Sequence, residues 1–536
     1  MFSANKRMAT NLLTKTDFIL YRECPNNVWV KRNRLEEYAR FEPSEFEKSL
    51  AEMGNDVEEL ARGMFPNGFL VERRSEGAQE LTKKLIEERT PVIFQPVFAT
   101  DKYLAALDVL KWNDSVGKYD IYEIKMSTTE DEDEEEDDGK PKRVNKKKEL
   151  QYEYDLAFQV NVAEECGVLI NQKFLVRLNR AYVRSGDLDF TPNQLFIIED
   201  KTEVIDILKT VAISEMSYAH TYLSSKEVPS APCPCYYKGR NSHCSAFSYI
   251  NPHVPAYSVH DLNRIGNSKK YLSELLAEGV LEVADVPIDD RLKPKEARGT
   301  AKQSKPRKLN QVLVHKSQEP MVDFESLKAE LDTLTFPLYF LDYETYPTAI
   351  PPYSGYRPYQ QIVFQYSLHV LEDKDSEPKH YESLILDGEP SERIAESLRK
   401  HIGDSGTVIS WYKTFENSRN KELANLLPDY KDFFLDVVNR TYDLMDIVDG
   451  QHYIHPGFEG RASIKKVLPV LAPHLSYKVL GVQSGTDAIE AYRKITVGEL
   501  VGDEMKEKER QMLEYCKLDT YAMYVLWKFF SDLVKE

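Results

Sequence analysis

Residues 340–346 constrain this chain most, because they are predicted to form a short buried strand that carries two carboxylates. Asp342 and Glu344 are two residues apart, and a strand sends alternate side chains to the same face. Two neighbouring anions repel one another, and burying them is costly unless a cation neutralises them. Carboxylate oxygens suit Mg²⁺ or Mn²⁺. The pair therefore predicts a divalent-metal site, and the alternative is two unrelated acids on a solvated edge strand.

The length and composition describe an ordinary globular protein. A chain of 536 residues is long enough for about two to four domains with large cores. Its hydrophobic content of 42% and charged content of 29% are typical of such proteins. The sequence has no run of about 18 apolar residues that would span a membrane, and residues 1–8 lack the apolar core of a signal peptide. We therefore expect a cytoplasmic protein with no membrane partner.

The net charge of −18 weakens the expectation of a nucleic-acid partner. An unbroken run of nine acids at residues 130–138 accounts for half of this charge, and a basic stretch follows at residues 140–148. A local basic groove can coexist with a negative net charge, because net charge mainly governs solubility and long-range steering. The charge density and the lack of apolar residues predict a disordered insertion over residues 128–149.

Two predicted strands in the N-terminal part carry a second set of charged residues. Residues 103–110 include Asp108, and residues 119–125 include Glu123 and Lys125 on one face. Asp108 and Glu123 could hold a divalent metal ion that lowers the pKa of an attacking water. Lys125 could stabilise the negative charge that develops. The alternative is a surface hairpin with one Glu–Lys pair. The Asp…Glu-x-Lys pattern resembles that of the PD-(D/E)XK nucleases.

The cysteines are too few for a disulfide scaffold, since there are six in the whole chain. Four of them are candidates for one Cys₄ site that would hold zinc or an iron–sulfur cluster: Cys24, Cys233, Cys235 and Cys244. Their spacing is not that of a zinc ribbon with two Cys-x₂-Cys pairs. Cys166 and Cys516 lie in predicted helices, and we expect both to be ordinary buried residues.

One cysteine before the Asp…Glu-x-Lys core and three after it is also the arrangement of the iron–sulfur RecB-like nucleases. Residues 1–250 resemble this family, which includes the AddB nuclease domain and the CRISPR-associated RecB-like exonucleases. The resemblance implies a restriction-endonuclease-like domain with a 4Fe–4S cluster as a structural staple. It also implies site roles for a set of polar residues: Glu58, Asp108, Glu123, Lys125 and Gln159. Glu58 follows a glycine by four residues, where the family usually has His, and a Tyr expected near Gln159 is missing.

Residues 251–319 are predicted to be a small helical module and a basic linker, and a second domain spans residues 320–536. In that domain three strands in succession precede alternating helix and strand. Tyr515 and Asp519 are four residues apart on a predicted helix, so they share a face. Together with Asp342-x-Glu344, and with Glu416 at the start of a helix after the fourth strand, they resemble the DEDDy branch of the DnaQ-like 3′→5′ exonucleases.

This second resemblance implies an RNase H-like fold in which four acids hold two metal ions and Tyr515 orients the attacking water. The family normally has Asp at the position of Glu416, and Asp443 is the competing candidate for the fourth acid. The two-domain layout also resembles a family of uncharacterised bacterial proteins.

We therefore expect an α/β protein with two metal-dependent nuclease sites that use Mg²⁺ or Mn²⁺ to hydrolyse phosphodiester bonds. DNA is favoured over RNA as the partner because both resembled families act mostly on DNA, and DNA repair or anti-phage defence are consistent roles. Two alternatives stay open. One is a nucleic-acid-binding protein in which one or both nuclease folds are inactive, and the other is a zinc-stapled RNA-processing nuclease.

Overall fold

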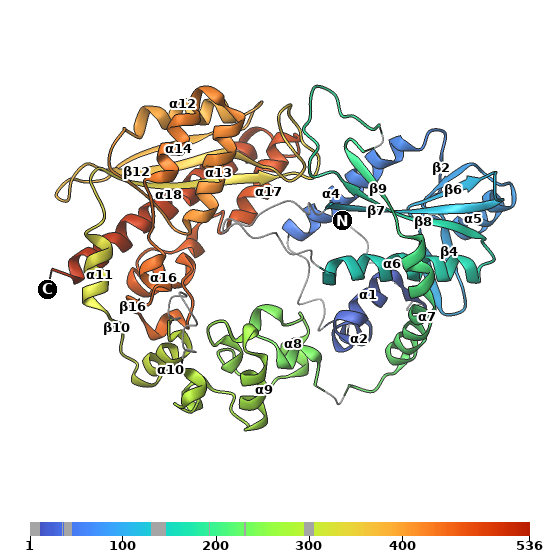
Figure 1. Cartoon of the computed structure of the whole chain (residues 1–536), viewed down its shortest axis with the longest axis horizontal. Helices are drawn as coiled ribbons and strands as arrows, with labels where there is room; N and C mark the ends of the chain where they lie inside the picture. Colours follow the sequence, from blue (N-terminus) through green and yellow to red (C-terminus); the bar gives the residue numbers. More distant parts are fainter. Residues whose placement is uncertain are drawn as a thin grey trace. The chain divides into compact units, whose positions relative to one another are not determined.

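The chain is a mixed α/β protein that forms two compact units (Figure 1). The computed structural model describes residues 11–34, 36, 45–129, 146–191, 193–229, 232–293 and 305–535. Unit 1 consists of Met1–Tyr236, Cys244–Asn251 and Thr348–Gln360. Unit 2 consists of Tyr237–His243, Pro252–Pro347 and Gln361–Glu536. Among the described residues, no helix combines the length and the apolar character needed to cross a membrane.

Unit 1 is built on a six-stranded mixed sheet with the strand order β2-β3-β6-β7-β8-β9. β6 (Val109–Asn113) and β7 (Lys118–Thr128) form an antiparallel hairpin, and β8 (Ile170–Leu178) pairs with β7 in parallel. A parallel pair needs a crossover connection, which contains α6 (Lys146–Glu165). The other strands of this sheet are β2 (Phe69–Leu70), β3 (Val92–Phe94) and β9 (Phe196–Asp200).

A three-stranded sheet anchors the first described residues of unit 1. β1 (Leu13–Thr14) pairs in parallel with β5 (Tyr103–Ala106), which also pairs with β4 (Val97–Ala99). Helix α1 (Lys15–Glu23) follows β1 directly, and the Thr14 hydroxyl caps it by accepting a hydrogen bond from the backbone N–H of Asp17. Among the described residues, unit 1 also contains the α-helices α2 (Pro25–Asn33), α4 (Glu45–Ala61), α5 (Ala78–Glu87), α7 (Thr202–Ser224) and α8 (Phe247–Ile250).

The predicted disordered insertion at residues 128–149 is too long at both ends. Thr128 is the last residue of β7, and residues 146–149 form the first turn of α6. Glu149 accepts a hydrogen bond from Arg177 at 3.0 Å and another from Lys201, and these contacts stabilise a helix start that charge density alone does not predict. The acidic run at residues 130–138 lies outside the described residues.

Unit 2 is built on a five-stranded sheet with the order β13-β12-β11-β14-β15. β11, β12 and β13 are antiparallel to their neighbours, whereas β14 pairs in parallel with β11 and β15 pairs in parallel with β14. The strands are β11 (Leu338–Pro347), β12 (Gln361–Leu371), β13 (Lys379–Leu384), β14 (Thr407–Ser410) and β15 (Thr441–Asp443).

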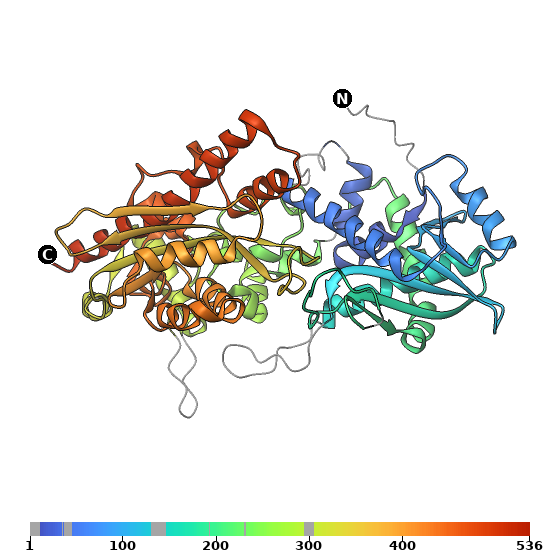
Figure 2. The same cartoon turned by 90° about the horizontal axis from the view of Figure 1, so that it is seen from above.

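Helices cover both faces of this sheet (Figure 2). Tyr339, Leu341 and Tyr343 of β11 belong to a core formed with α12 (Ser391–His401), α13 (Lys413–Leu426) and α14 (Lys431–Asn439). Leu338 and Phe340 belong to a second core, formed with α16 (Ile464–Leu471), α17 (Gly485–Thr496) and α18 (Gly502–Leu533). β11 is therefore buried on both sides, with alternate residues in different cores.

The segment predicted as a connecting module does not stand apart from the second domain. Pro252–Pro347 belongs to unit 2, and this segment contains α9 (Lys269–Ala277) and α10 (Arg307–Ser317). Residues 294–304 of the predicted basic linker lie outside the described residues. Unit 2 is completed by α11 (Phe324–Leu331), α15 (Asp446–Asp449), β10 (Met321–Val322) and β16 (Tyr453–Ile454).

The connection between β11 and β12, residues 348–360, belongs to unit 1. Ala349 lies in a core of that unit, and the Tyr359 hydroxyl donates a hydrogen bond to the backbone carbonyl of Met126 at 2.5 Å. The side chain of Tyr356 is also buried.

Candidate functional site

The acids of unit 2 converge at the carboxyl-terminal half of β11. Asp342 and Glu344 continue the line of Leu338 and Phe340, so they are on the same face as the core that contains α18. A β-bulge interrupts the pairing with β12 directly after Glu344, and bulges of this kind re-aim side chains next to functional sites. Glu344 is buried and Asp342 is partly buried.

Helix α18 brings three further side chains to this face. Tyr515, Cys516 and Asp519 are all buried, and the Cys516 Sγ lies 3.6 Å from Oδ2 of Asp342. Thr520 fixes the helix to β12, because its hydroxyl is 2.7 Å from the hydroxyl of Ser367 and 2.8 Å from Nδ1 of His369. Tyr515 and Asp519 lie on one face of α18, as their four-residue spacing predicts, and both interact electrostatically with the two acids of β11.

Burial and mutual repulsion raise the pKa values of these carboxyl groups. Burial, followed by the charges of Asp519 and Glu344, holds the pKa of Asp342 well above its usual range. Burial and the charge of Asp519 raise the pKa of Glu344 to about 8. Burial raises the pKa of Asp519 to about 6, although a hydrogen bond from Tyr477 acts in the opposite direction. Burial and mutual repulsion thus disfavour the ionised forms of these carboxyl groups.

Glu416 and Asp443 have different environments. Asp443 accepts hydrogen bonds from the backbone N–H groups of Tyr412 and Lys413, both at 2.9 Å, and from that of Met445 at 3.1 Å. Its carboxylate is therefore occupied in holding the turn that starts α13. Glu416 lies in the first turn of α13, is buried, and has an Oε2 atom with no hydrogen-bond partner among the described residues.

The charge of Glu416 also links it to the cluster. It contributes to the raised pKa of Asp342 and of Glu344, and burial raises the pKa of Glu416 itself to about 8. Of the two candidates for a fourth acid, Glu416 has the free oxygen atom.

Tyr477 and Lys465 also lie at the unit 2 site. The Tyr477 hydroxyl donates a hydrogen bond to Oδ1 of Asp519 at 2.5 Å. The Lys465 Nζ lies 5.6 Å from the ring centre of Tyr515 and 5.7 Å from that of Tyr477. Burial, then the charge of Asp519, raises the pKa of Tyr515, so its phenol stays neutral and can donate. No spacing rule connects residues 465, 477 and 515, so the number of residues between them does not predict this contact.

The unit 1 site is arranged around Glu123, whose side chain is 1% exposed. Its Oε1 accepts hydrogen bonds from Lys125 Nζ at 2.6 Å and from Lys15 Nζ at 2.8 Å, and its Oε2 accepts one from Gln159 Nε2 at 2.7 Å. Asp155 is a second acceptor for Lys125 and lies 3.6 Å from Lys15. Two anions and two cations therefore neutralise one another. Burial acts to raise the pKa of Glu123, but Lys125 and Lys15 outweigh it, so this pKa is lowered.

Asp108 and Glu58 are near this centre but are engaged separately. Oδ2 of Asp108 accepts a hydrogen bond from the backbone N–H of Ile124 at 2.8 Å, and burial, then the charge of Glu123, holds its pKa well above the usual range. Oε1 of Glu58 accepts hydrogen bonds from Gln95 at 2.7 Å and from Arg62 at 2.8 Å. Among the described residues, Glu58, Asp108 and Glu123 do not form a group with metal-ligand spacing, whereas Asp342, Glu344 and Cys516 do.

Lys15 and Asp155 were not predicted as site residues. Asp155 is four residues before Gln159 on α6, so their shared face was a usable signal. Lys15 had no such signal, because it reaches Glu123 only through the packing of α1, whose Phe18 ring stacks on that of Phe158 with centroids 5.4 Å apart.

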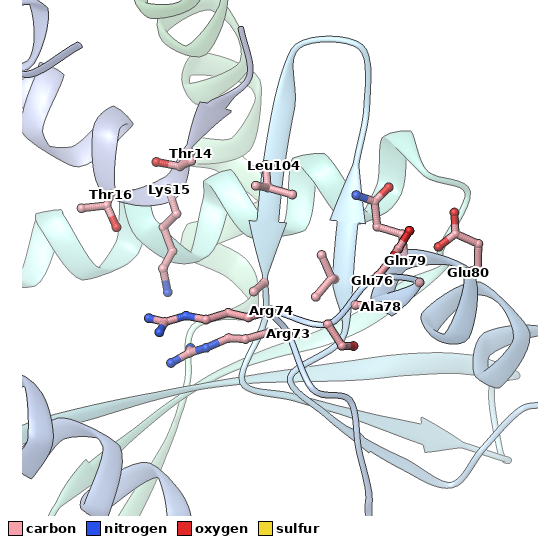
Figure 3. Close-up of a pocket in the computed structure, with 14 residues that line it drawn as sticks. Thr14, Lys15, Thr16, Arg73, Arg74, Glu76, Ala78, Gln79, Glu80 and Leu104 are labelled. Atoms are coloured by element: carbon pink, nitrogen blue, oxygen red, sulfur yellow. The ribbon is translucent and has the colours of Figure 1, made fainter. Parts of the chain in front are cut away.

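A basic pocket of about 720 Å³ opens next to Lys15 (Figure 3). Arg73 and Arg74 extend their guanidinium groups toward the side on which Lys15 lies, and another side is lined by Gln79 and by the two acids of the pocket, Glu76 and Glu80. Both arginines are exposed, and neither has an ion-pair partner within the described part of the chain. The pocket can therefore accept an anionic group beside the Glu123 centre.

The four predicted cysteines come together in unit 1. Cys24 lies between α1 and α2, Cys233 and Cys235 lie in a segment after α7, and Cys244 precedes α8. Their Sγ atoms are all within 4.8 Å of one another, and Cys24 and Cys244 are 3.7 Å apart. Four thiols in one place suit zinc or an iron–sulfur cluster. Cys516 is buried as expected, but the expectation for Cys166 was wrong, because this residue follows the end of α6 and is exposed.

Comparison with known proteins gives matches without an assigned activity. Residues 339–463 match the model of a domain of unknown function (DUF2779), a span that includes Asp342, Glu344, Glu416 and Asp443 but ends before Tyr477. The uncharacterized protein MG366 of Mycoplasma genitalium is 26% identical over 215 residues, which cover 37% of this chain and 32% of that protein. Its homologue in Mycoplasma pneumoniae is 24% identical over 213 residues, which cover 36% of this chain and 32% of that homologue. The chain thus spans about a third of the length of these relatives, and no solved structure matches.

The raised pKa values predict how stability depends on pH in the absence of a divalent ion. Glu344 and Glu416, with pKa values of about 8, hold protons in the folded chain at pH values where the unfolded chain has released them. The folded state therefore binds more protons between about pH 5 and pH 8, and stability falls as pH rises through this window. We expect Glu344→Gln to raise the free energy of unfolding of metal-depleted protein at pH 8 by about 1 kcal/mol or more.

Thermal unfolding of wild type and Glu344→Gln between pH 5 and pH 8 tests this prediction. The difference in Tm should grow with pH, and added Mn²⁺ should stabilise the wild type more than the variant. Glu392→Gln, on the exposed face of α12, is the matched control and should follow the wild type. A difference that stays constant over this pH range would contradict the prediction.

Proposed function

We propose that this chain is a metal-dependent nuclease and that the acid cluster of unit 2 is its principal active site. The observation that carries this proposal is the convergence of four carboxylates with raised pKa values and no ion-pair partner among the described residues: Asp342, Glu344, Glu416 and Asp519. The ionised form of such a cluster is unfavourable unless a cation binds to it. The order of three antiparallel strands followed by parallel ones supports the RNase H-like resemblance.

The four acids are the residues that would hold Mg²⁺ or Mn²⁺, since their oxygen donors fit hard divalent ions. When bound, two such ions stabilise the entering and leaving oxygens of an in-line displacement at phosphorus. The chain's own contribution is to hold the acids in place. Tyr477 fixes Asp519 through its hydrogen bond, and the neutral phenol of Tyr515 is the group that would orient a water molecule. The resemblance implies a 3′→5′ direction for this site.

The resemblance implies a second nuclease site in unit 1, with Asp108, Glu123 and Glu58 as metal-binding residues, although these three acids are not within metal-ligand spacing of one another here. The Lys125 ammonium group donates a hydrogen bond to Glu123. This contact supports the role that the Glu-x-Lys pattern predicts for Lys125, which is to stabilise negative charge. Gln159 orients Glu123 through the other carboxylate oxygen. The basic pocket of Lys15, Arg73 and Arg74 is suited to a phosphate of the substrate backbone. DNA as the substrate rests on the two resemblances.

One observation favours a second candidate function for unit 1. Lys15 and Lys125 already neutralise Glu123 and Asp155, so this centre needs no metal ion to offset the cost of burial. In this alternative, unit 1 binds nucleic acid without cleaving it, and unit 2 alone is the nuclease.

Single substitutions in each site test the nuclease proposal and separate the two candidates. We expect Asp342→Asn to lower Mn²⁺-dependent exonuclease activity of the full chain by about 10²-fold or more, equivalent to about 3 kcal/mol of transition-state stabilisation. Glu123→Gln should abolish a second activity if unit 1 cleaves, and should leave all cleavage unchanged if unit 1 only binds. The assay uses 5′- and 3′-labelled single- and double-stranded DNA and RNA with Mg²⁺ or Mn²⁺.

Asp373→Asn, after β12, and Asp187→Asn, in unit 1, are exposed matched controls that should retain full activity. Metal-dependent activity that survives in the double variant Asp342→Asn/Glu123→Gln would overturn both site assignments. Nucleic-acid binding with no cleavage under any of these conditions would instead indicate a binding protein.

Because Glu416 and Asp443 make different contacts, we expect their substitution to have different effects. Glu416→Gln should fold normally but bind Mn²⁺ at least about 10-fold more weakly, because it removes a charge whose oxygen atom is free. Asp443→Ala should lower the free energy of unfolding by about 2 kcal/mol, because it leaves three backbone N–H groups without their acceptor. Mn²⁺ titration and thermal unfolding measure the two effects. If Asp443→Ala instead weakens Mn²⁺ binding and Glu416→Gln changes only stability, then Asp443 and not Glu416 is the fourth metal-binding acid.

The basic pocket predicts a salt-dependent contribution to nucleic-acid binding. The double substitution Arg73→Ala/Arg74→Ala should weaken binding and reduce the slope of log K against log salt concentration by about 1 to 2. Fluorescence anisotropy with a labelled oligonucleotide in EDTA measures binding without cleavage. Lys111→Ala/Lys118→Ala removes two exposed lysines outside the pocket and should leave the slope close to that of the wild type. Equal slopes for the wild type and both double variants would show that the pocket does not contact the nucleic-acid backbone.

A further inference from the structure

The four cysteines of unit 1 form a closed and largely buried site. Cys24, Cys233 and Cys235 are at most 3% exposed, and Cys244 is partly buried. The surrounding contacts hold the segments that carry them. Trp29 donates a hydrogen bond to the backbone carbonyl of Ser225 at 2.9 Å, and Ser245 donates one to the side chain of Asn27 at 3.1 Å. The thiols are therefore brought together by the fold and are not paired as disulfides.

The distances between the sulfur atoms discriminate between two kinds of occupant. A single tetrahedral ion with metal–sulfur bonds of about 2.3 Å places its four sulfur ligands about 3.8 Å apart. In a 4Fe–4S cluster each thiolate binds a different iron atom, which separates the sulfur atoms by roughly 6 Å. Here Cys24 and Cys244 are 3.7 Å apart, and no pair among the four exceeds 4.8 Å. The thiol donors suit both occupants, but the spacing fits the single ion and does not fit the cluster.

We propose that Cys24, Cys233, Cys235 and Cys244 bind one tetrahedral metal ion, and that this ion is zinc. Four thiolates are a soft ligand set that selects zinc over Mg²⁺, Mn²⁺ or Ca²⁺. The set is complete without water, which is the property of a structural site and not of a catalytic one. This inference concerns unit 1 alone and does not depend on the proposed nuclease activity.

The position of Cys24 indicates that the metal ion would stabilise the position of helix α1. Cys24 directly follows α1, and Lys15 at the start of the same helix forms the ion pair with Glu123. A metal ion at Cys24 thus fixes one end of a nine-residue helix whose other end supplies a cation to the Glu123 centre. Loss of the ion should free α1 and weaken the contact between Lys15 and Glu123, because binding energy at such a site is folding energy.

Metal and sulfide analysis of the full chain, expressed with both iron and zinc available and purified without oxygen, tests this proposal. We expect about one zinc ion per chain that is retained during dialysis, no acid-labile sulfide, and no absorbance band near roughly 400 nm. Replacement by Co²⁺ should give the intense visible bands of a tetrahedral thiolate site. Removal of the zinc by a chelator should make four additional thiols reactive.

The variants distinguish this site from the acid cluster, which also contains a cysteine. Cys24→Ser and Cys244→Ser should each reduce bound zinc at least tenfold, whereas Cys166→Ser and Asp342→Asn should retain it. Cys244 is partly exposed, so its variant keeps the test usable if Cys24→Ser does not fold. Iron with stoichiometric sulfide and a band near roughly 400 nm, either as isolated or after anaerobic reconstitution, would overturn the proposal. Zinc that persists in both cysteine variants, or a wild type without bound metal, would also overturn it.

Discussion

The repulsion between carboxylates that are buried together is the physical constraint on which unit 2 depends. Asp342, Glu344, Glu416 and Asp519 come from β11, α13 and α18, so three separate elements must meet for the cluster to exist. The fold holds them there with neutral contacts: Thr520 bonds α18 to β12, Tyr477 bonds Asp519, and Asp443 holds the turn that starts α13. These contacts fix the geometry but carry no positive charge themselves. A rigid frame that holds carboxyl groups with raised pKa values is an arrangement that a divalent ion can exploit.

Unit 1 meets the same constraint in a different way. Its buried acids, Glu123 and Asp155, are paired with the ammonium groups of Lys15 and Lys125, so the centre is close to neutral without any ion. Metal binding at this centre would have to compete with two ammonium groups that already satisfy Glu123. The two centres therefore differ in how much a bound metal ion would offset the cost of burying their acids. In both, acidic side chains on a strand lie close to side chains from a helix. For this reason we propose unit 2 as the principal nuclease site and consider two functions, cleavage or binding of nucleic acid, for unit 1.

Where the spacing of residues within one element controls the outcome, prediction from sequence agreed with the structure. Asp342 and Glu344 share a face because they alternate on a strand, and Tyr515 and Asp519 share a face because they are one helical turn apart. The same reasoning would have found Asp155 beside Gln159. It failed for Cys166, because the helix ends at Glu165 and leaves that cysteine exposed. It also misjudged residues 146–149, because the partners of Glu149 are Arg177 and Lys201, which come from later in the chain.

The sequence by itself determined the α/β class, the presence of acids on buried strands, and the set of cysteines, since these follow from local periodicity and residue type. Only the tertiary structure decided which side chains meet. Glu416 has a free oxygen atom, whereas the carboxylate of Asp443 accepts hydrogen bonds from the backbone N–H groups of Tyr412 and Lys413 at the start of α13. Lys15 reaches Glu123, and Tyr477 reaches Asp519, across separations of 108 and 42 residues. The spacing of the four sulfur atoms likewise depends on how α1, α2 and the segments before α8 pack, which no count of residues between cysteines can supply.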